Sequence, residues 1–272
     1  MSTTAMTSFD EVYGLPDPRG YFTRLQPYAY QTPAHAQPVF RALAGELPAG
    51  RRTVLDVCCS YGINAALLNH ELTLDDLYAH YTSEAAARLS TAELIDRDRE
   101  FYAERRRPDA VPVIGLDVSG PAVSYALAVG LLEEGYAQDL EASEPEEGLR
   151  RSAPGVGLIT VTGGTSFLTG RTFARLLTAV GRPVPVAAFV LRTHDYRDIA
   201  RCLESYGLRV ERAGSTSPQR RFTDPEEQRL ATAAVTALGE DPAGKEAAGW
   251  FHTRLHLARP RPGAQPLPEA RS

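Results

Sequence analysis

One stretch of the chain constrains the fold more than any other, because it joins a buried strand to an apolar helix through a run of small residues. Residues 54–57 (Val-Leu-Asp-Val) are typical of a short buried strand, and residues 63–68 of the first turns of a helix. The five residues between them are Cys-Cys-Ser-Tyr-Gly. A strand, a tight turn and a helix form the first half of a nucleotide-binding βαβ unit, in which N–H groups at the start of the helix face the ligand.

The rest of the chain continues the alternation of strand and helix. Predicted strands cover residues 54–57, 113–119, 135–140, 157–162, 184–192, 208–212 and 250–257. Predicted helices cover residues 63–68, 122–132, 173–180, 197–206 and 228–238. This order predicts an α/β fold with a doubly wound, mostly parallel, seven-stranded sheet and helices on both faces.

Three acidic residues lie at the ends of the first three predicted strands. They are Asp56, Asp117 and Asp139. A carboxylate at the tip of the second strand can accept hydrogen bonds from both hydroxyls of a ribose, because it offers two acceptor oxygens. Each acid alone could be a surface carboxylate or a helix cap. Their recurrence at successive strand ends favours a nucleoside-binding site.

Residues 56–62 resemble the first motif of class I S-adenosylmethionine (SAM)-dependent methyltransferases, in which an acidic residue is followed by Gly-x-Gly-x-Gly. Asp56 takes the acidic place, and Cys58, Ser60 and Gly62 take the three glycine places. Because cysteine and serine adopt positive φ poorly, we expect a less tight turn than in the family. The resemblance extends over roughly residues 54–260, and it implies a last strand antiparallel to the fifth.

The resemblance implies SAM as the cofactor, bound at the ends of the first strands. Asp117 would take the ribose hydroxyls and Asp139 the adenine amino group, with the turn beneath the methionine part. The residues expected to bind the cofactor are Asp56, Cys58, Ser60, Tyr61, Gly62, Asn64, Asp117, Val118, Ser119, Gln138, Asp139, Leu140, Thr162 and Gly163.

Methyl transfer from a sulfonium requires aligned reactants and exclusion of water, and a base only where the acceptor carries a proton. His194 and Tyr196 follow the fifth predicted strand and Tyr30 lies in the aromatic N-terminal region, so these three are the catalytic candidates. A lone loop histidine is more often structural or solvated. The Asn/Asp-Pro-Pro-Tyr/Phe signature of DNA and protein amino-methylases is absent, which favours a small-molecule acceptor.

Two other functions remain open. An enzyme of the same fold could transfer or cyclise the aminocarboxypropyl arm of SAM and release methylthioadenosine. The chain could also bind SAM, or a nicotinamide nucleotide, without catalysis. The Gly-x-Gly-x-x-Gly dinucleotide fingerprint is missing, which counts against NAD.

Two regions exceed a minimal domain of this class. Residues 1–50 are rich in tyrosine and proline. Most of these aromatics are expected to pack the extension onto the domain, and Tyr28 and Tyr30 are the best candidates for a lid over the cofactor and acceptor. An insert at about 72–110 should form one or two helices. Its many charges favour a solvated surface, and the alternative is that it builds one wall of the acceptor pocket. These regions flank or interrupt a SAM-binding domain at 51–260, and 261–272 is expected to be disordered.

Composition excludes several classes of protein. The net charge of −5 argues against a general polyanion binder, so no nucleic-acid partner is expected. The three cysteines and six histidines show neither a disulfide framework nor metal-ligand spacing, so no metal is expected. No signal peptide or membrane span is recognisable. We expect a cytoplasmic protein with a small-molecule acceptor, no membrane partner and possible homodimerisation.

Overall fold

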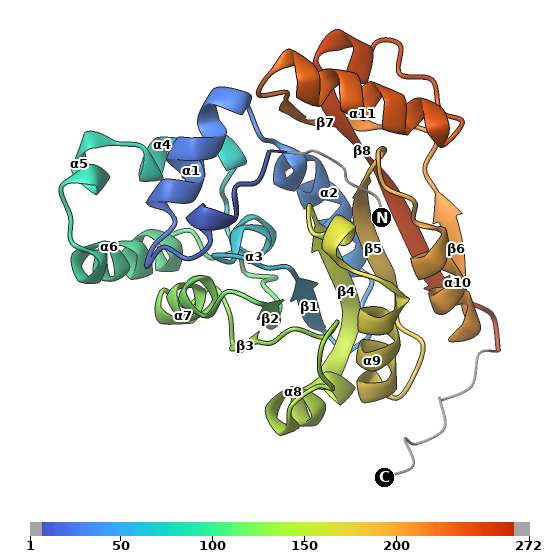
Figure 1. The fold of residues 1–272 in the computed structure, drawn as a ribbon. Coiled ribbons are helices and arrows are strands. Elements are labelled where there is room, and N and C mark those ends of the chain that lie inside the picture. Colours follow the sequence, from blue (N-terminus) through green and yellow to red (C-terminus); the bar gives the residue numbers. More distant parts are fainter. Residues whose placement is uncertain (1–6, 264–272) are drawn as a thin grey trace.

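A computed structural model describes residues 7–263, and it contains one open sheet of eight strands (Figure 1). The strands are β1 (Thr53–Val57), β2 (Val113–Asp117), β3 (Glu134–Ala137), β4 (Val156–Thr162), β5 (Val186–Leu191), β6 (Leu208–Arg212), β7 (Ser217–Arg221) and β8 (Trp250–Pro260). Their order is β3-β2-β1-β4-β5-β8-β6, and β7 pairs with β8. Strands β1 to β5 are parallel, whereas β8 runs antiparallel to β5.

The doubly wound α/β fold is therefore confirmed, with a correction to the number of strands. The seven predicted strands are all present, and the antiparallel last strand lies beside the fifth. The missed strand is β7, Ser-Pro-Gln-Arg-Arg, which has no apolar alternation and contains Pro218. Proline donates no hydrogen bond and is confined to edges and bulges. The register of β7 on β8 shifts between Pro218 and Arg220, so tertiary pairing alone makes this segment a strand.

Successive strand residues point to opposite faces of the sheet, and each face carries its own helical layer. Val54 and Leu158 lie in the core beneath one layer, whereas Leu55 and Ile159 lie in the core beneath the other. The first layer contains α1 (Arg19–Leu25), α2 (Thr32–Gly45), α3 (Ile63–Asn69) and α7 (Gly120–Ala128). The second contains α8 (Glu147–Ser152), α9 (Gly170–Val180) and α10 (Arg197–Ser205). A further helix, α11 (Pro225–Ala237), packs beside β7 and β8 (Figure 1).

The insert forms three helices rather than one or two. They are α4 (Leu74–Tyr81), α5 (Glu84–Ala87) and α6 (Thr91–Ala103). Thr73 and Ser90 begin α4 and α6 with reciprocal capping boxes. The fully buried Asp98 accepts hydrogen bonds from His80 and from the hydroxyls of Tyr81 and Tyr125, so the insert is fastened to α7.

The carboxyl end of the described chain is anchored to the sheet beside β6. Arg261 donates from its backbone to Gly207 and from Nε to Leu208. The rest of the predicted disordered tail, residues 264–272, lies outside the described residues. Within 7–263, no helix has the length and apolar character needed to cross a membrane.

Candidate functional site

The turn after β1 has a left-handed backbone at every second residue. Cys58 has φ 57°, Ser60 has φ 51° and Gly62 has φ 78°. The expectation of a looser turn is therefore wrong, because the two non-glycine residues adopt the positive φ that glycine would adopt. A left-handed residue with a side chain costs about 1–2 kcal/mol. Strain of this kind clusters at functional sites, where the surrounding structure enforces it.

Neighbouring segments explain why the turn holds this shape. Gly164, two residues after β4, has no Cβ, and a Cβ there would lie 2.2 Å from the thiol sulfur of Cys58. The loops after β1 and β4 therefore touch through Cys58 and Gly164. Gly62 precedes α3, and a Cβ at this position would lie 3.2 Å from atoms of Ala126 and Leu131. The buried hydroxyl of Ser60 has no hydrogen-bond partner among the described residues.

Asp56 lies beneath this turn, almost completely buried. Its carboxylate accepts hydrogen bonds from Asn64 Nδ2 at 2.9 Å and Thr160 Oγ1 at 2.8 Å. Thr162 Oγ1 lies 2.9 Å from Asn64 Nδ2, which continues the network to the end of β4. The pKa of Asp56 is raised to about 7, because burial, together with the charge of Asp117, raises it by more than the hydrogen bonds from Thr160 and Asn64 lower it. The hydrogen bond between Asp56 and Asn64 thus joins the end of β1 to the start of α3 and stabilises the turn between them.

Asp117 lies at the tip of β2 and faces the same turn. It accepts one backbone hydrogen bond on each carboxylate oxygen, from Ser60 at 2.8 Å and from Ser119 at 2.9 Å. Each oxygen retains a second lone pair, so the group can still accept from a vicinal diol. The next side chain, Val118, is 72% exposed. An exposed aliphatic side chain beside a carboxylate offers an apolar surface for a flat ring.

The third strand end supplies the remaining predicted cofactor residues. Gln138 and Leu140 are buried, and Gln138 Oε1 accepts from the backbone of Glu146 at 3.0 Å. Asp139 accepts from the backbone of Glu141 through Oδ1 only. Asp139 Oδ2 therefore remains the acceptor available at this end of the site.

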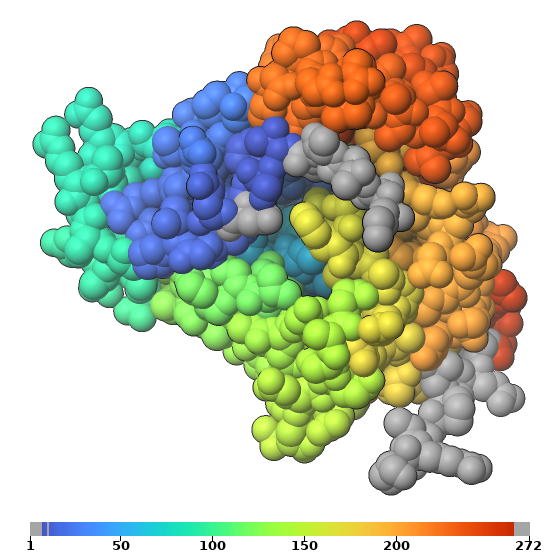
Figure 2. Space-filling model, viewed as in Figure 1, coloured from blue at the N-terminus to red at the C-terminus, as the bar shows by residue number. Residues whose placement is uncertain are grey.

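An N-terminal strap, Thr7–Leu15, crosses this edge of the sheet. The hydroxyl of Tyr61 lies 2.6 Å from the carbonyl oxygen of Val12 and 2.9 Å from that of Leu15, and the hydroxyl of Ser119 donates to the carbonyl of Tyr13. Figure 2 shows a hollow bordered by the blue N-terminal segment, the green segment after β2 and the yellow segment after β4. Tyr61 and Ser119 were predicted to bind the cofactor, and in the structure their hydroxyls hold the strap against the loops after β1 and β2.

The other end of the strap reaches the far side of the sheet. The backbone N–H of Thr7 donates to Glu227 of α11 at 2.7 Å. Glu227 also pairs with Arg220 of β7, and both side chains are buried. The strap therefore spans the site between two fixed attachments, one at the turn after β1 and the other at α11.

The three catalytic candidates occupy different surroundings. Tyr30 reaches the loop after β4, since a Cβ on Gly163 would lie 3.0 Å from the Tyr30 hydroxyl. Burial raises the pKa of Tyr30 to about 12. Burial lowers the pKa of His194, so its imidazole is neutral at pH 7 and could accept a proton. Tyr196 is buried in the core on the α9–α10 face, with its ring 4.4 Å from that of His256. The structure does not bring Tyr196 together with the cofactor residues.

Comparisons with known proteins agree with the sheet architecture only. No protein-family model and no curated protein matches the chain. Similar solved structures include magnesium protoporphyrin IX methyltransferase from Synechocystis PCC 6803, with 14% identity and a TM-score of 0.40 over 84% of this chain and 78% of that one. Geranyl diphosphate C-methyltransferase from Streptomyces coelicolor A3(2) has 10% identity and a TM-score of 0.44 over 92% and 88%.

A third similar structure is a TehB-like SAM-dependent methyltransferase from Corynebacterium glutamicum ATCC 13032 Kitasato, with 14% identity and a TM-score of 0.38 over 82% of this chain and 86% of that one. At these identities and TM-scores, the likeness decides neither the cofactor nor the reaction. Both depend on the geometry of the site itself.

Sequence reasoning missed several residues of the site. Thr160 is an ordinary strand residue in sequence, yet it donates to Asp56. Gly164 makes the contact with Cys58, and the Gly-Gly pair after β4 was its only signal. Phe167, in the loop that follows, is 71% exposed. The attachment of the strap through backbone carbonyls leaves no trace in side-chain patterns.

Proposed function

We propose that the chain is a SAM-dependent methyltransferase that acts on a small-molecule acceptor. The observation that carries the proposal is the left-handed backbone at Cys58 and Ser60 beside the carboxylate of Asp117. A chain without a ligand to accommodate there would gain stability from glycine at both positions. The left-handed turn instead brings its backbone close to the hollow at the strand ends.

The residues present fit this cofactor. Asp117 would take the ribose hydroxyls, Val118 would support one face of adenine and Asp139 Oδ2 would accept from the adenine amino group. The unpartnered hydroxyl of Ser60 supplies a further polar group at the methionine end. When bound, SAM supplies an electrophilic methyl group for direct displacement. The chain's own residues bind and orient the reactants and exclude water.

The acceptor would lie between the end of β4 and the strap. Tyr30 stays protonated at neutral pH, so its hydroxyl can orient an acceptor by donating a hydrogen bond. His194 is the candidate base, because its imidazole is neutral at pH 7. Its neighbour Asp195 does not orient it, since that carboxylate binds Arg197 at 2.6–3.0 Å through Nε, a terminal nitrogen and the backbone. The strap borders the hollow in which the reactants would lie, and the insert packs on α1 and α7.

The exposed Val118 gives the sharpest test. Val118→Asp should weaken SAM binding at least about tenfold in calorimetry, because it places a charge where an adenine ring would lie, and it should leave the melting temperature unchanged. Leu238→Asp is the matched control, since Leu238 is also an exposed large aliphatic residue, at the end of α11. Equal SAM affinity in Val118→Asp and the wild type would refute the site.

The reaction is tested by the leaving nucleoside. Incubation with SAM and a mixture of small-molecule acceptors should release S-adenosylhomocysteine, identified by mass spectrometry. Methylthioadenosine would instead indicate transfer or cyclisation of the aminocarboxypropyl arm. Tight SAM binding without either product across many acceptors would favour a binding protein.

A further inference from the structure

A second candidate site lies at the opposite edge of the sheet, near the amino ends of β1, β4 and β5. A cavity of about 450 Å³ opens there between the loop before β1, the end of α9 and the end of β8. Its lining includes Arg51, Arg182, Pro183 and Pro260. The volume lies within the range of small-molecule pockets. The residues proposed for methyl transfer lie at the other ends of these strands.

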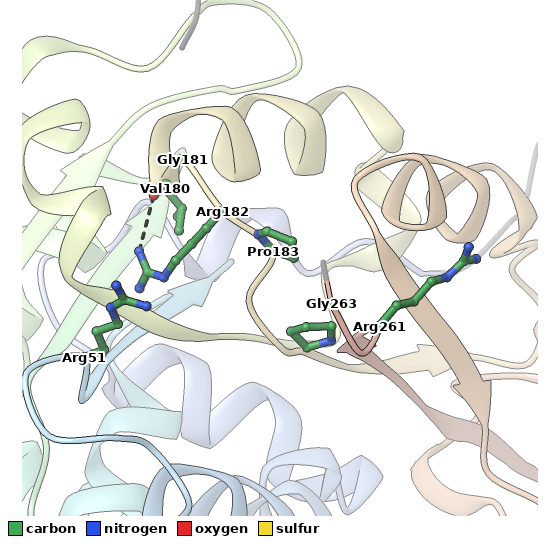
Figure 3. Close-up of a pocket in the computed structure, with 8 residues that line it drawn as sticks. Arg51, Val180, Gly181, Arg182, Pro183, Arg261 and Gly263 are labelled. Carbon is green, nitrogen blue, oxygen red and sulfur yellow. Dashed lines mark hydrogen bonds between the residues drawn. The ribbon is translucent and has the colours of Figure 1, made fainter. Parts of the chain in front are cut away.

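Two arginines of this cavity face each other. Figure 3 shows the guanidinium groups of Arg51 and Arg182 directed toward one another, whereas that of Arg261 points away. Within residues 7–263, no carboxylate oxygen lies within 4.0 Å of a nitrogen of Arg51 or Arg182. Burial lowers the pKa of Arg182, and the charge of Arg51 lowers it further. Two cations placed together without a counter-ion in an acidic protein are unfavourable unless an anion joins them.

The fold holds both arginines in these positions. Arg182 follows Gly181, the left-handed residue that ends α9, and donates to the carbonyl oxygens of Pro154 at 2.9 Å and Val156 at 2.5 Å. The backbone of Arg51 packs against Gly157 so closely that a Cβ there would lie 2.0 Å from the Arg51 carbonyl oxygen. These contacts fix the guanidinium of Arg182 and the backbone of Arg51, whose side chain is exposed, and neither guanidinium is paired with a carboxylate of residues 7–263.

We propose that this cavity binds a small molecule bearing a phosphate or carboxylate group, with the oxyanion between Arg51 and Arg182. Planar guanidinium groups suit such anions because they donate paired hydrogen bonds. The rings of Pro183 and Pro260 give the rest of the cavity an apolar surface, which suits a ligand with a nonpolar body. The anion is supplied by a free ligand.

Inorganic phosphate is the probe, measured by calorimetry and by thermal melting at constant ionic strength against chloride. Arg51→Gln should lower phosphate affinity at least about fivefold, because it removes one charged donor and leaves the anchored Arg182 in place. Arg52→Gln is the matched control, because it removes the same charge from the exposed neighbouring residue, which does not line the cavity. Its phosphate affinity should remain within about twofold of the wild type.

Two results would overturn the proposal. One is a wild-type chain that phosphate stabilises no more than chloride does. The other is an equal loss of phosphate binding in Arg51→Gln and Arg52→Gln, which would indicate general charge attraction.

Discussion

Replacement of Ser60 by glycine should stabilise the protein and weaken its cofactor binding. Ser60 combines φ 51° with a buried hydroxyl that has no partner among the described residues. Its N–H donates to Asp117, and a glycine would keep that bond. Serine is therefore less stable than glycine at this position, both in its backbone conformation and in its side chain. A hydrogen bond from the ligand to the hydroxyl would explain why the chain has serine there.

The two unfavourable contributions can be added. The left-handed backbone costs about 1–2 kcal/mol, and an unsatisfied buried hydroxyl costs about 1–3 kcal/mol. Glycine returns about 0.5–1 kcal/mol of this by making the unfolded chain more flexible. We expect Ser60→Gly to raise the free energy of unfolding by about 2 kcal/mol, which corresponds to roughly 4–8 °C in melting temperature.

Urea unfolding followed by circular dichroism measures the stability, and calorimetry measures SAM affinity, which should fall about tenfold with the loss of one hydrogen bond to a charged ligand. Ser60→Ala separates the two contributions, because it removes the hydroxyl and keeps the left-handed backbone. It should gain less stability than Ser60→Gly and lose similar affinity. A Ser60→Gly protein that unfolds at lower urea than the wild type would refute the strain, and unchanged SAM affinity would refute the role of the hydroxyl.

Three further predictions concern the same edge of the sheet. The pKa of Asp56 is raised from 3.8 to about 7, so the folded chain holds a proton that the unfolded chain loses, and stability falls as pH rises through this window. Between about pH 5.5 and pH 8, the wild type should lose about 2 kcal/mol more unfolding free energy than Asp56→Asn, measured by urea titration. Parallel pH curves for the two proteins would contradict this. Gly62→Ala should destabilise by about 1–2 kcal/mol because of its φ of 78° and the neighbouring Leu131, and a melting temperature equal to wild type would show that the turn relaxes freely. Tyr61→Phe removes the hydroxyl that binds the strap, so the turnover number should fall several-fold more than the SAM affinity. Equal falls in turnover, measured by kinetics, and in SAM affinity, measured by calorimetry, would instead make the strap part of the cofactor site.

The sequence predicted the sheet well because its central strands are buried on both faces. Residues 156–162 and 186–191 are buried throughout, and such runs are recognisable without knowledge of their partners. Some helices also begin with residues typical of a helix N-terminus, such as Ser119 and Pro121 at the start of α7. Strand β7 was missed because it has no buried apolar run, and its polar residues join the sheet by pairing with β8.

The site was predictable in part for the same reason. Strand ends placed Asp56, Asp117 and Asp139 at one edge, and the structure confirms that edge. The roles of Tyr61 and Ser119 were not predictable, because their partners are backbone carbonyls of a segment about 45–110 residues away in sequence. The positive φ of Cys58 was not predictable either, because cysteine rarely adopts a left-handed backbone.

Strand β8 has a consequence for how the protein is made. It hydrogen-bonds to β5, β6 and β7, so β6 and β7 join the sheet only through it. Until the ribosome has released residues 250–260, a nascent chain exposes the open edge of β5, and unpaired edges invite pairing with other chains. Translation that stalls or ends before Trp250 should therefore yield an aggregation-prone product rather than a shortened folded protein.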